Sequence, residues 1–139
     1  MAQSIRDVMT PHPIALPATS SVIEAAQAMR DANIGDVIVV ENGRICGMMT
    51  DRDITVRGVA EERNLSSLTL GDICSRQLTT LSPTDSVEDA VLLMREKALR
   101  RLPVVEGDTP VGIVSLGDLA ITQDPNSTLG TISVAPANR

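Results

Sequence analysis

Hydrophobic and polar residues follow two periods along this chain, and these periods predict helices and strands in a repeating order. The clearest helix is indicated by an apolar stripe at the spacing i, i+3, i+4, i+7, formed by Val22, Ala25, Ala26 and Met29. Ser21 and Glu24 make a capping-box pattern at its start. A second copy of this pattern follows at Ser86–Asp89, with an equivalent stripe of Val87, Ala90, Val91 and Met94.

A β-hairpin is predicted after each of these helices. Asp36–Glu41 contains four consecutive β-branched residues, Asn42-Gly43 is a strong two-residue turn signal, and Arg44–Thr50 returns as the partner strand. Before the first helix, two prolines favour extended chain and Ile14–Leu16 is predicted as a short strand. A last helix begins at Asp51. The predicted order of each unit is therefore strand, helix, strand, strand, helix.

These elements occur twice because the chain repeats itself. A shift of 65 residues aligns Ile5–Ile54 with Leu70–Leu119 without a gap. Thirteen of the fifty aligned positions are identical: Asp7, Leu16, Thr19, Ser21, Val22, Ala25, Met29, Arg30, Val39, Val40, Glu41, Gly47 and Asp53. We divide the sequence into repeat 1 (4–59), a polar linker (60–67), repeat 2 (68–121) and a polar C-terminal tail (122–139). In this tail, Gly130–Val134 is the one candidate for a short edge strand.

The fold class predicted from these elements is α+β, with mixed helices and strands. About 50 residues are too few to cover a sheet alone. We therefore expect two tandem β-α-β-β-α repeats that pack sheet to sheet with pseudo-twofold symmetry.

Composition excludes several classes of function. The chain of 139 residues has a formal net charge of −6 and no Phe, Tyr or Trp, which argues against nucleic-acid binding. We expect no membrane association and no secretion, because there is no basic-then-apolar leader and no apolar run of spanning length. Cys46 and Cys74 have no metal-ligand spacing and suggest no disulfide framework, so a reduced, cytoplasmic setting is expected. His12 lies alone between two prolines and is given no role.

Two short motifs connect this repeat to a known family. Gly47-Met-Met-Thr-Asp-Arg-Asp53 and Gly112-Ile-Val-Ser-Leu-Gly-Asp118 occupy corresponding places, where the third strand passes into the last helix. Together with Arg100-Arg-Leu-Pro-Val-Val105, they resemble the CBS domain pair, or Bateman module, over about residues 4–121. The resemblance implies a small stand-alone prokaryotic protein that forms a flat homodimer. It also implies clefts that bind adenosine-type ligands such as AMP, ADP or ATP, with NAD or S-adenosylmethionine as alternatives.

The residues of these clefts fit the parts of a nucleotide. Thr50 and Ser115 begin helices, where free N–H groups favour a phosphate, and Asp53 and Asp118 follow as acceptors for ribose hydroxyls. The apolar wall is expected from Ile14 and Val37 in the first cleft, and from Thr80, Leu102 and Pro103 in the second. Arg100 and Arg101 would contact phosphates at the mouth of the second cleft.

The same residues also have a purely structural interpretation. Thr50-x-x-Asp53 and Ser115-x-x-Asp118 are capping boxes in their own right, and the two arginines are equally consistent with a solvated or interface pair. The first cleft departs from the family pattern, because it has no proline equivalent to Pro103 and because Asp36 stands at its mouth. We therefore expect the second site to be the better one.

The function predicted from the sequence is regulatory and not enzymatic. The chain has no glycine-rich phosphate loop, no metal-ligand set and no nucleophile paired with a histidine. We expect a nucleotide-sensing module that requires no cofactor and that signals to an unknown protein partner by a conformational change. The alternative is an interaction or structural homodimer whose clefts are vestigial.

Overall fold

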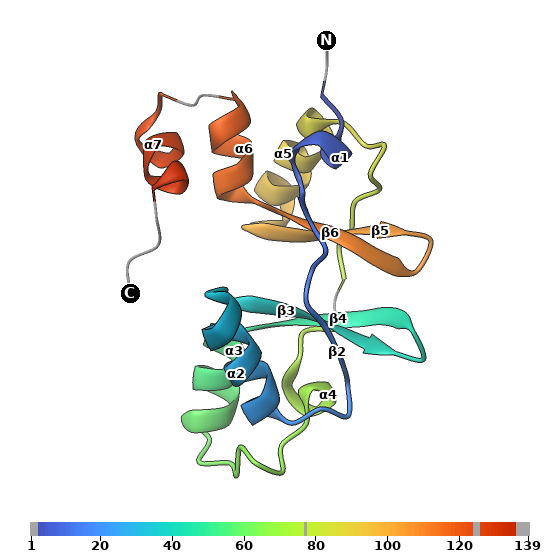
Figure 1. The fold of residues 1–139 in the computed structure, drawn as a ribbon, viewed down its shortest axis with the longest axis vertical. Helices are drawn as coiled ribbons and strands as arrows, with labels where there is room; N and C mark the ends of the chain where they lie inside the picture. The colour runs from blue at the N-terminus through green and yellow to red at the C-terminus, as the bar shows by residue number, and fades with distance from the viewer. Residues whose placement is uncertain (1–2, 77, 124–125, 136–139) are drawn as a thin grey trace. The chain divides into compact units, whose positions relative to one another are not determined.

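The computed structural model describes residues 3–76, 78–123 and 126–135. The chain forms two compact units, and Figure 1 labels their helices and strands. Unit 1 contains residues 1–12, 79–107 and 111–139, and unit 2 contains residues 13–78 and 108–110. The units therefore differ from the two repeats, and the repeat boundaries describe the sequence alone.

Unit 2 contains the sheet of repeat 1. Its strands are β2 (Ala15–Pro17), β3 (Asp36–Glu41) and β4 (Arg44–Thr50), in the order β2-β3-β4. Strand β2 runs parallel to β3, and β3 runs antiparallel to β4. The helices are α2 (Val22–Ala32), α3 (Asp51–Asp53), the π-helix η1 (Ile54–Val59) and α4 (Leu70–Ile73).

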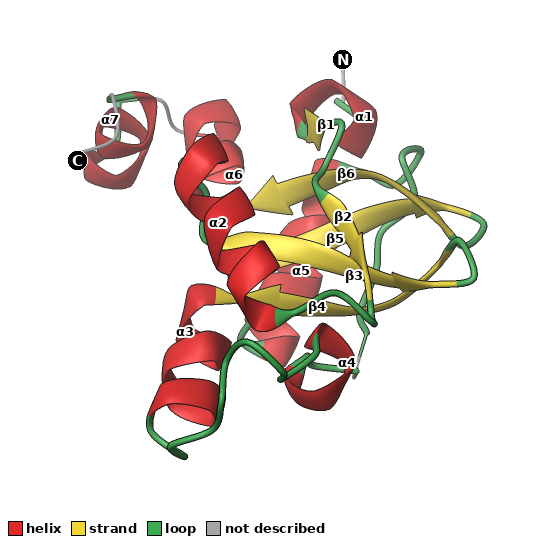
Figure 2. Ribbon diagram, turned by 60° about the horizontal axis from the view of Figure 1, so that its bottom comes forward, coloured by secondary structure: helices red, strands yellow, loops and turns green. Residues whose placement is uncertain are grey.

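Unit 1 contains the sheet of repeat 2. Its strands are β1 (Thr10–Pro11), β5 (Arg101–Glu106) and β6 (Thr109–Ser115), in the order β1-β6-β5. Its helices are α1 (Ile5–Val8), α5 (Val87–Lys97), α6 (Leu116–Gln123) and α7 (Thr128–Val134). Figure 2 shows the helices and strands of both units in a second view.

The two repeats exchange their opening segments. Helix α1 belongs to repeat 1, yet Ile5 is fully buried in the core of unit 1, and Thr10 in β1 pairs with Ile113 in β6. In the same way α4, from repeat 2, packs in unit 2, where Leu70 is fully buried. Each opening helix places its apolar residue in a core that its own repeat does not form, so neither repeat is complete by itself.

The main predicted elements are confirmed. Both long helices begin at the predicted capping residues, since Ser21 and Ser86 accept hydrogen bonds from the backbone of Glu24 and Asp89. Their predicted stripes face the cores, where Met29 and Met94 are both 6% exposed. The hairpin turn forms with φ of 53° at Asn42 and 77° at Gly43, the left-handed conformation that this turn requires.

Two predicted elements differ in the structure. Gly130–Val134 does not form an edge strand; these residues are part of helix α7, whose first turn is capped because Ser127 accepts a hydrogen bond from the Gly130 amide. The last helix of repeat 1 is only three residues long in its α-helical part and continues as the π-helix η1. Its counterpart α6 remains α-helical through Gln123.

Candidate ligand-binding site

The first candidate motif forms a complete capping box at the end of β4. The Asp53 amide donates to Thr50 Oγ1 at 3.2 Å, and the Thr50 amide donates to Asp53 Oδ2 at 2.9 Å. The other carboxylate oxygen, Oδ1, lies 3.9 Å from Nε of Arg57, one helical turn further on. Arg57 also donates to the carbonyl of Ile73 at 3.0 Å, so Asp53 lies beside a cation that is itself anchored to α4.

The second motif repeats the capping box at the end of β6. The Asp118 amide donates to Ser115 Oγ at 3.1 Å, and the Ser115 amide donates to Asp118 Oδ2 at 2.9 Å. Thr122, which replaces Arg57 at the equivalent position, donates to the Asp118 carbonyl instead. Within residues 3–76, 78–123 and 126–135, no ion-pair partner lies within 4 Å of Asp118. The second motif thus lacks the cation that lies beside Asp53 in the first.

The start of the preceding strand lies beside each motif. In unit 2, Asp36 pairs with Thr50, and the Asp51 amide donates to the Gly35 carbonyl at 3.0 Å. In unit 1 the corresponding bond joins the Leu116 amide to the Arg100 carbonyl at 2.8 Å. Hydrogen bonding in each unit thus brings together the predicted strand residues and the predicted helix start.

The remaining polar and apolar candidates lie next to these strands. Leu81 pairs in parallel with Val104, so that the half-buried Thr80 enters beside β5 near Pro103. In unit 2 the Ile38 amide donates to the Ile14 carbonyl at 2.9 Å, which places the half-buried Ile14 beside β3. Both residues therefore lie at the predicted end of their sheet.

Three residues predicted to line the apolar walls are buried in the units themselves. Val37 and Leu102 are 0% exposed and belong to the hydrophobic cores of units 2 and 1, and Pro103 is buried as well. Their contact with a ligand stays a prediction, because their side chains already contribute to the packing of the cores.

The two sites differ strongly in charge. The first motif contains Asp51 and Asp53, and Asp36 lies beside it on the neighbouring strand, where it is only 8% exposed. At the positions equivalent to Gly35 and Asp36, repeat 2 has Arg100 and Arg101, both exposed. The first motif thus has three carboxylates with Arg57 beside Asp53, whereas two exposed guanidinium groups lie at the start of the strand beside the second motif.

Two neighbours of the motifs were not found from the sequence. Arg57 could have been found from its spacing of four residues from Asp53, which is the spacing of helical ion pairs. Ser133 could not: a Cβ atom on Gly117 would lie 2.8 Å from Ser133 Oγ and 3.6 Å from Ser115 Oγ. Helix α7 therefore packs over the start of α6, directly beside the second motif.

Metal ligands and membrane spans were also sought among the described residues. No group of three His, Cys, Asp or Glu side chains lies in an arrangement that could hold a metal ion. None of the described helices is long and apolar enough to cross a membrane.

Comparison with known proteins identifies the repeats. The model of the CBS domain matches residues 5–58 and again residues 70–122. The CBS domain-containing protein YhcV of Bacillus subtilis is 39% identical over 128 residues, which cover 92% of this chain and 91% of that protein.

Solved structures show the same fold. The crystal structure of Hypoxic Response Protein I with two coordinated zinc ions has a TM-score of 0.77 at 29% identity and covers 86% of this chain and 98% of that one. The CBS domain pair of protein MJ0100, in complex with 5′-methylthioadenosine and S-adenosyl-L-methionine, has a TM-score of 0.81 at 23% identity. It covers 91% of this chain and 100% of that one.

Proposed function

The chain belongs to the CBS domain family, and from this premise we propose that it is a regulatory module that binds an adenosine-type nucleotide at Ser115 and Asp118. The observation that carries the proposal is that the Ser115–Asp118 capping box is joined to the exposed Arg100 by the Leu116 amide, which donates to the Arg100 carbonyl at 2.8 Å. In this role the protein senses a ligand and catalyses no reaction.

The residues of unit 1 divide the recognition of a nucleotide among them. Asp118 uses Oδ2 to cap α6, which fixes the carboxylate and leaves Oδ1 to accept hydrogen bonds from ribose hydroxyls. Arg100 is exposed at the same end of the sheet and supplies a forked donor for phosphate oxygens. Thr80 contributes a half-buried hydroxyl beside β5. No such set forms at the first motif, where Arg57 lies beside Asp53.

AMP, ADP and ATP are the ligands best matched to these charges. The CBS pair of MJ0100 holds two adenosine compounds without phosphate groups, which keeps S-adenosylmethionine as an alternative. The two classes differ in charge, so Arg100→Gln separates them. It weakens a phosphate-bearing ligand and leaves a sulfonium ligand unaffected.

Signalling follows from a difference in affinity. A ligand shifts the equilibrium between two conformations by no more than its preference for one of them. We propose that the liganded conformation is the one recognised by a partner protein.

Thermal unfolding with a panel of ligands tests the binding. The chain has no aromatic residue, so far-ultraviolet circular dichroism or calorimetry must replace intrinsic fluorescence. A ligand present at a hundred times its Kd and bound only by the folded state raises the free energy of unfolding by about 2.7 kcal/mol. We expect such a stabilisation with at least one of AMP, ADP and ATP.

Asp118→Ala and Asp53→Ala are a matched pair for this experiment. Both substitutions remove half of a capping box, and each is expected to lower the stability of the unliganded protein by about 1 kcal/mol. Only Asp118→Ala should abolish the stabilisation by nucleotide. An equal loss in both variants, or a loss in Asp53→Ala alone, would refute the choice of the second site. If no nucleotide stabilises the wild type at millimolar concentration, the sensing proposal is wrong.

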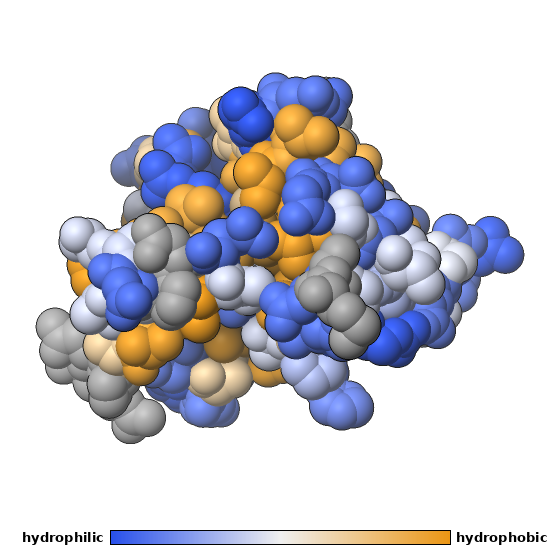
Figure 3. Space-filling model, turned by 90° about the horizontal axis from the view of Figure 1, so that it is seen from above, coloured by the Kyte–Doolittle hydropathy of each residue, from blue (hydrophilic) through white to orange (hydrophobic). Residues whose placement is uncertain are grey.

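The second candidate function is that of an interaction or structural protein, which acts as a homodimer. An open hollow of about 720 Å³ lies between α5 and α6, with the exposed Leu99 and Leu116 among its lining residues. Figure 3 shows apolar side chains that lie open to solvent on one face of the molecule. Burial of this groove against a second copy would remove its apolar surface from water. Sedimentation equilibrium, with Leu116→Glu as the disrupting variant, tests this proposal independently of any ligand.

A further inference from the structure

Two free thiols lie close together in unit 2, next to Gly47, where the first motif begins. Cys46 is half-buried in β4, and Cys74 is the buried residue that ends α4. The two segments are held against each other by hydrogen bonds between Met48 and Ser75, at 3.1 Å and 2.9 Å. The cysteines therefore come from parts of the chain that the fold brings together.

A β-bulge turns Cys46 toward the core that contains Cys74. Val39 pairs with Gly47 and Val40 pairs with Ile45, so Cys46 is the extra residue of β4. Its side chain packs against the core cluster of which Cys74 is a member.

The glycine next to Cys46 leaves room for the second sulfur. A Cβ atom on Gly47 would lie only 3.0 Å from Sγ of Cys74 and 2.6 Å from the carbonyl oxygen of Ser75. Because Gly47 has no side chain, the thiol of Cys74 lies directly over the backbone beside Cys46.

Unit 1 contains the same arrangement, but neither of its two equivalent residues is a cysteine. The residues equivalent to Cys46 and Cys74 are Val111 and Met9, and both pack against the core of unit 1. Met9 lies over Gly112 as Cys74 lies over Gly47. The packing is thus satisfied by ordinary apolar side chains, and it does not explain why unit 2 has two thiols at these positions.

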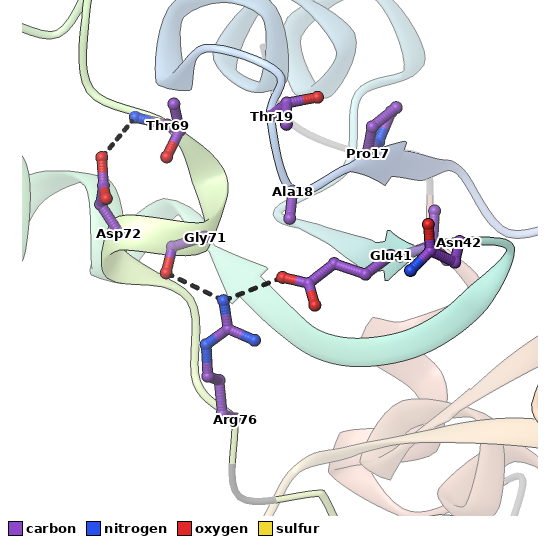
Figure 4. A pocket seen from close by; sticks show the side chains of 10 residues that line it. Pro17, Ala18, Thr19, Glu41, Asn42, Thr69, Gly71, Asp72 and Arg76 are labelled. Atoms are coloured by element: carbon purple, nitrogen blue, oxygen red, sulfur yellow. Dashed lines mark hydrogen bonds and ion pairs between the residues drawn. The ribbon is translucent and has the colours of Figure 1, made fainter.

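The half-buried Cys46 lines an open hollow of about 450 Å³ together with Glu41, Asn42, Arg44 and Ile45. A neighbouring hollow of about 530 Å³ contains Arg76, as Figure 4 shows. Nη2 of Arg76 lies 3.2 Å from Oε1 of Glu41 and 3.3 Å from the carbonyl of Gly71. Charged groups of both signs therefore lie beside Cys46: Glu41, which pairs with Arg76, and Arg44, which lies 3.7 Å from Asp108. A small molecule with both ammonium and carboxylate groups matches these charges.

We propose that Cys46 and Cys74 form a thiol–disulfide exchange site whose substrate is a small disulfide that carries ammonium and carboxylate groups. The thiolate of Cys46 attacks one sulfur of the substrate, forms a mixed disulfide and releases the first small thiolate, which takes up a proton. The thiolate of Cys74 then attacks the sulfur of Cys46 and releases the second. The two protein thiols lose two electrons, and the substrate is reduced to two thiols.

The environment of the thiols makes this exchange depend on pH. Burial raises the pKa of Cys46, and the carboxylate of Glu41 adds to the increase, whereas the guanidinium of Arg76 lowers the pKa and donates a hydrogen bond. Burial also raises the pKa of Cys74; Arg76 again opposes the increase, and Cys46, Glu41 and Asp53 add to it. Since the thiolate is the nucleophile, the exchange is slow near pH 7 and accelerates as the pH rises.

Oxidised glutathione is the probe for the test. The reduced full-length chain is incubated with it, remaining thiols are blocked with N-ethylmaleimide, and the intact mass and the peptide map are measured. We expect a disulfide between Cys46 and Cys74 of the same chain. The intact mass should be that of one chain with no glutathione and no maleimide attached.

Unit 1 supplies the residues for the controls. Cys74→Met should stop the reaction at a mixed disulfide on Cys46, and Cys46→Val should leave Cys74 reduced, because Met9 and Val111 show that both replacements fit equivalent positions. The proposal is overturned if the wild type retains bound glutathione, if the disulfide links two chains, or if the folded chain does not react while the chain unfolded in guanidinium does.

Discussion

Ala98 offers a quantitative test of how the second repeat ends its long helix. It follows α5 with φ of 53° and ψ of 42°, the left-handed conformation, and its amide donates to the carbonyl of Met94. The equivalent residue after α2 is Asn33, with φ of 56° and ψ of 49°. Asparagine tolerates this conformation, whereas the Cβ atom of alanine crowds the following carbonyl at a cost of about 1–2 kcal/mol. Strain is therefore expected at Ala98.

Ala98→Gly should stabilise the protein. Glycine removes the strain but gives up conformational freedom on folding, at a cost of about 0.5–1 kcal/mol, so that a net gain of about 1 kcal/mol is expected. For a chain of 139 residues this corresponds to an increase in Tm of about 3 °C, from an unfolding entropy of about 2 cal/mol/K per residue. Asn33→Gly should change stability less than Ala98→Gly, because asparagine already tolerates the left-handed conformation at a helix C-terminus.

Calorimetry or far-ultraviolet circular dichroism measures these differences. Ala28→Gly, in the middle of α2, is the matched control, because the same replacement in a right-handed helical residue should cost about 1 kcal/mol. If Ala98→Gly is neutral or destabilising while Ala28→Gly shows its expected cost, the reasoning about strain at Ala98 is refuted.

Two further predictions concern α7 and the thiols. Gly117→Ala should displace α7, since the new Cβ would lie 2.8 Å from Ser133 Oγ; faster amide exchange in α7 would show it, and adding Ser133→Gly should restore the protection. Unchanged exchange in the single variant would contradict the packing of α7 over α6. Arg76→Gln should raise the pKa of Cys46, because it removes the cation that lowers it, and so should shift the rate of reaction with oxidised glutathione to higher pH. An unchanged pH profile, or a shift to lower pH, would contradict this effect of Arg76 on the pKa of Cys46.

Much of the local structure could be predicted because local patterns determine it. Ser21 and Ser86 cap their helices through residues three positions away, and Asn42-Gly43 supplies the left-handed residues of its turn. The 65-residue repeat likewise predicted equivalent motifs at Thr50 and Ser115, and both form the same capping box. Each of these features depends on neighbours a few residues apart.

The C-terminal segment was predicted wrongly, because its local composition favours another element than the one it forms. Gly130–Val134 combines β-branched residues with threonine and serine, a composition that favours a strand over a helix. In the structure the cap from Ser127 and the packing of Ser133 over Gly117 select the helix. A local cap and a contact between α6 and α7 therefore outweighed the strand preference of these residues.

The sequence by itself determined that this chain is a tandem CBS pair, because a gapless repeat, two glycine-to-aspartate motifs and helical stripes are all visible along one dimension. Only the tertiary structure decided that the opening helices exchange between units, that Val37 and Leu102 are buried in the cores, and that Arg57 is anchored to the carbonyl of Ile73. Burial and pairing depend on which segments meet in space, and the apolar residues of α1 and α4 pack against residues of the other repeat. Because such contacts depend on the fold, Thr50-x-x-Asp53 and Ser115-x-x-Asp118 have different surroundings although they look equivalent in the sequence.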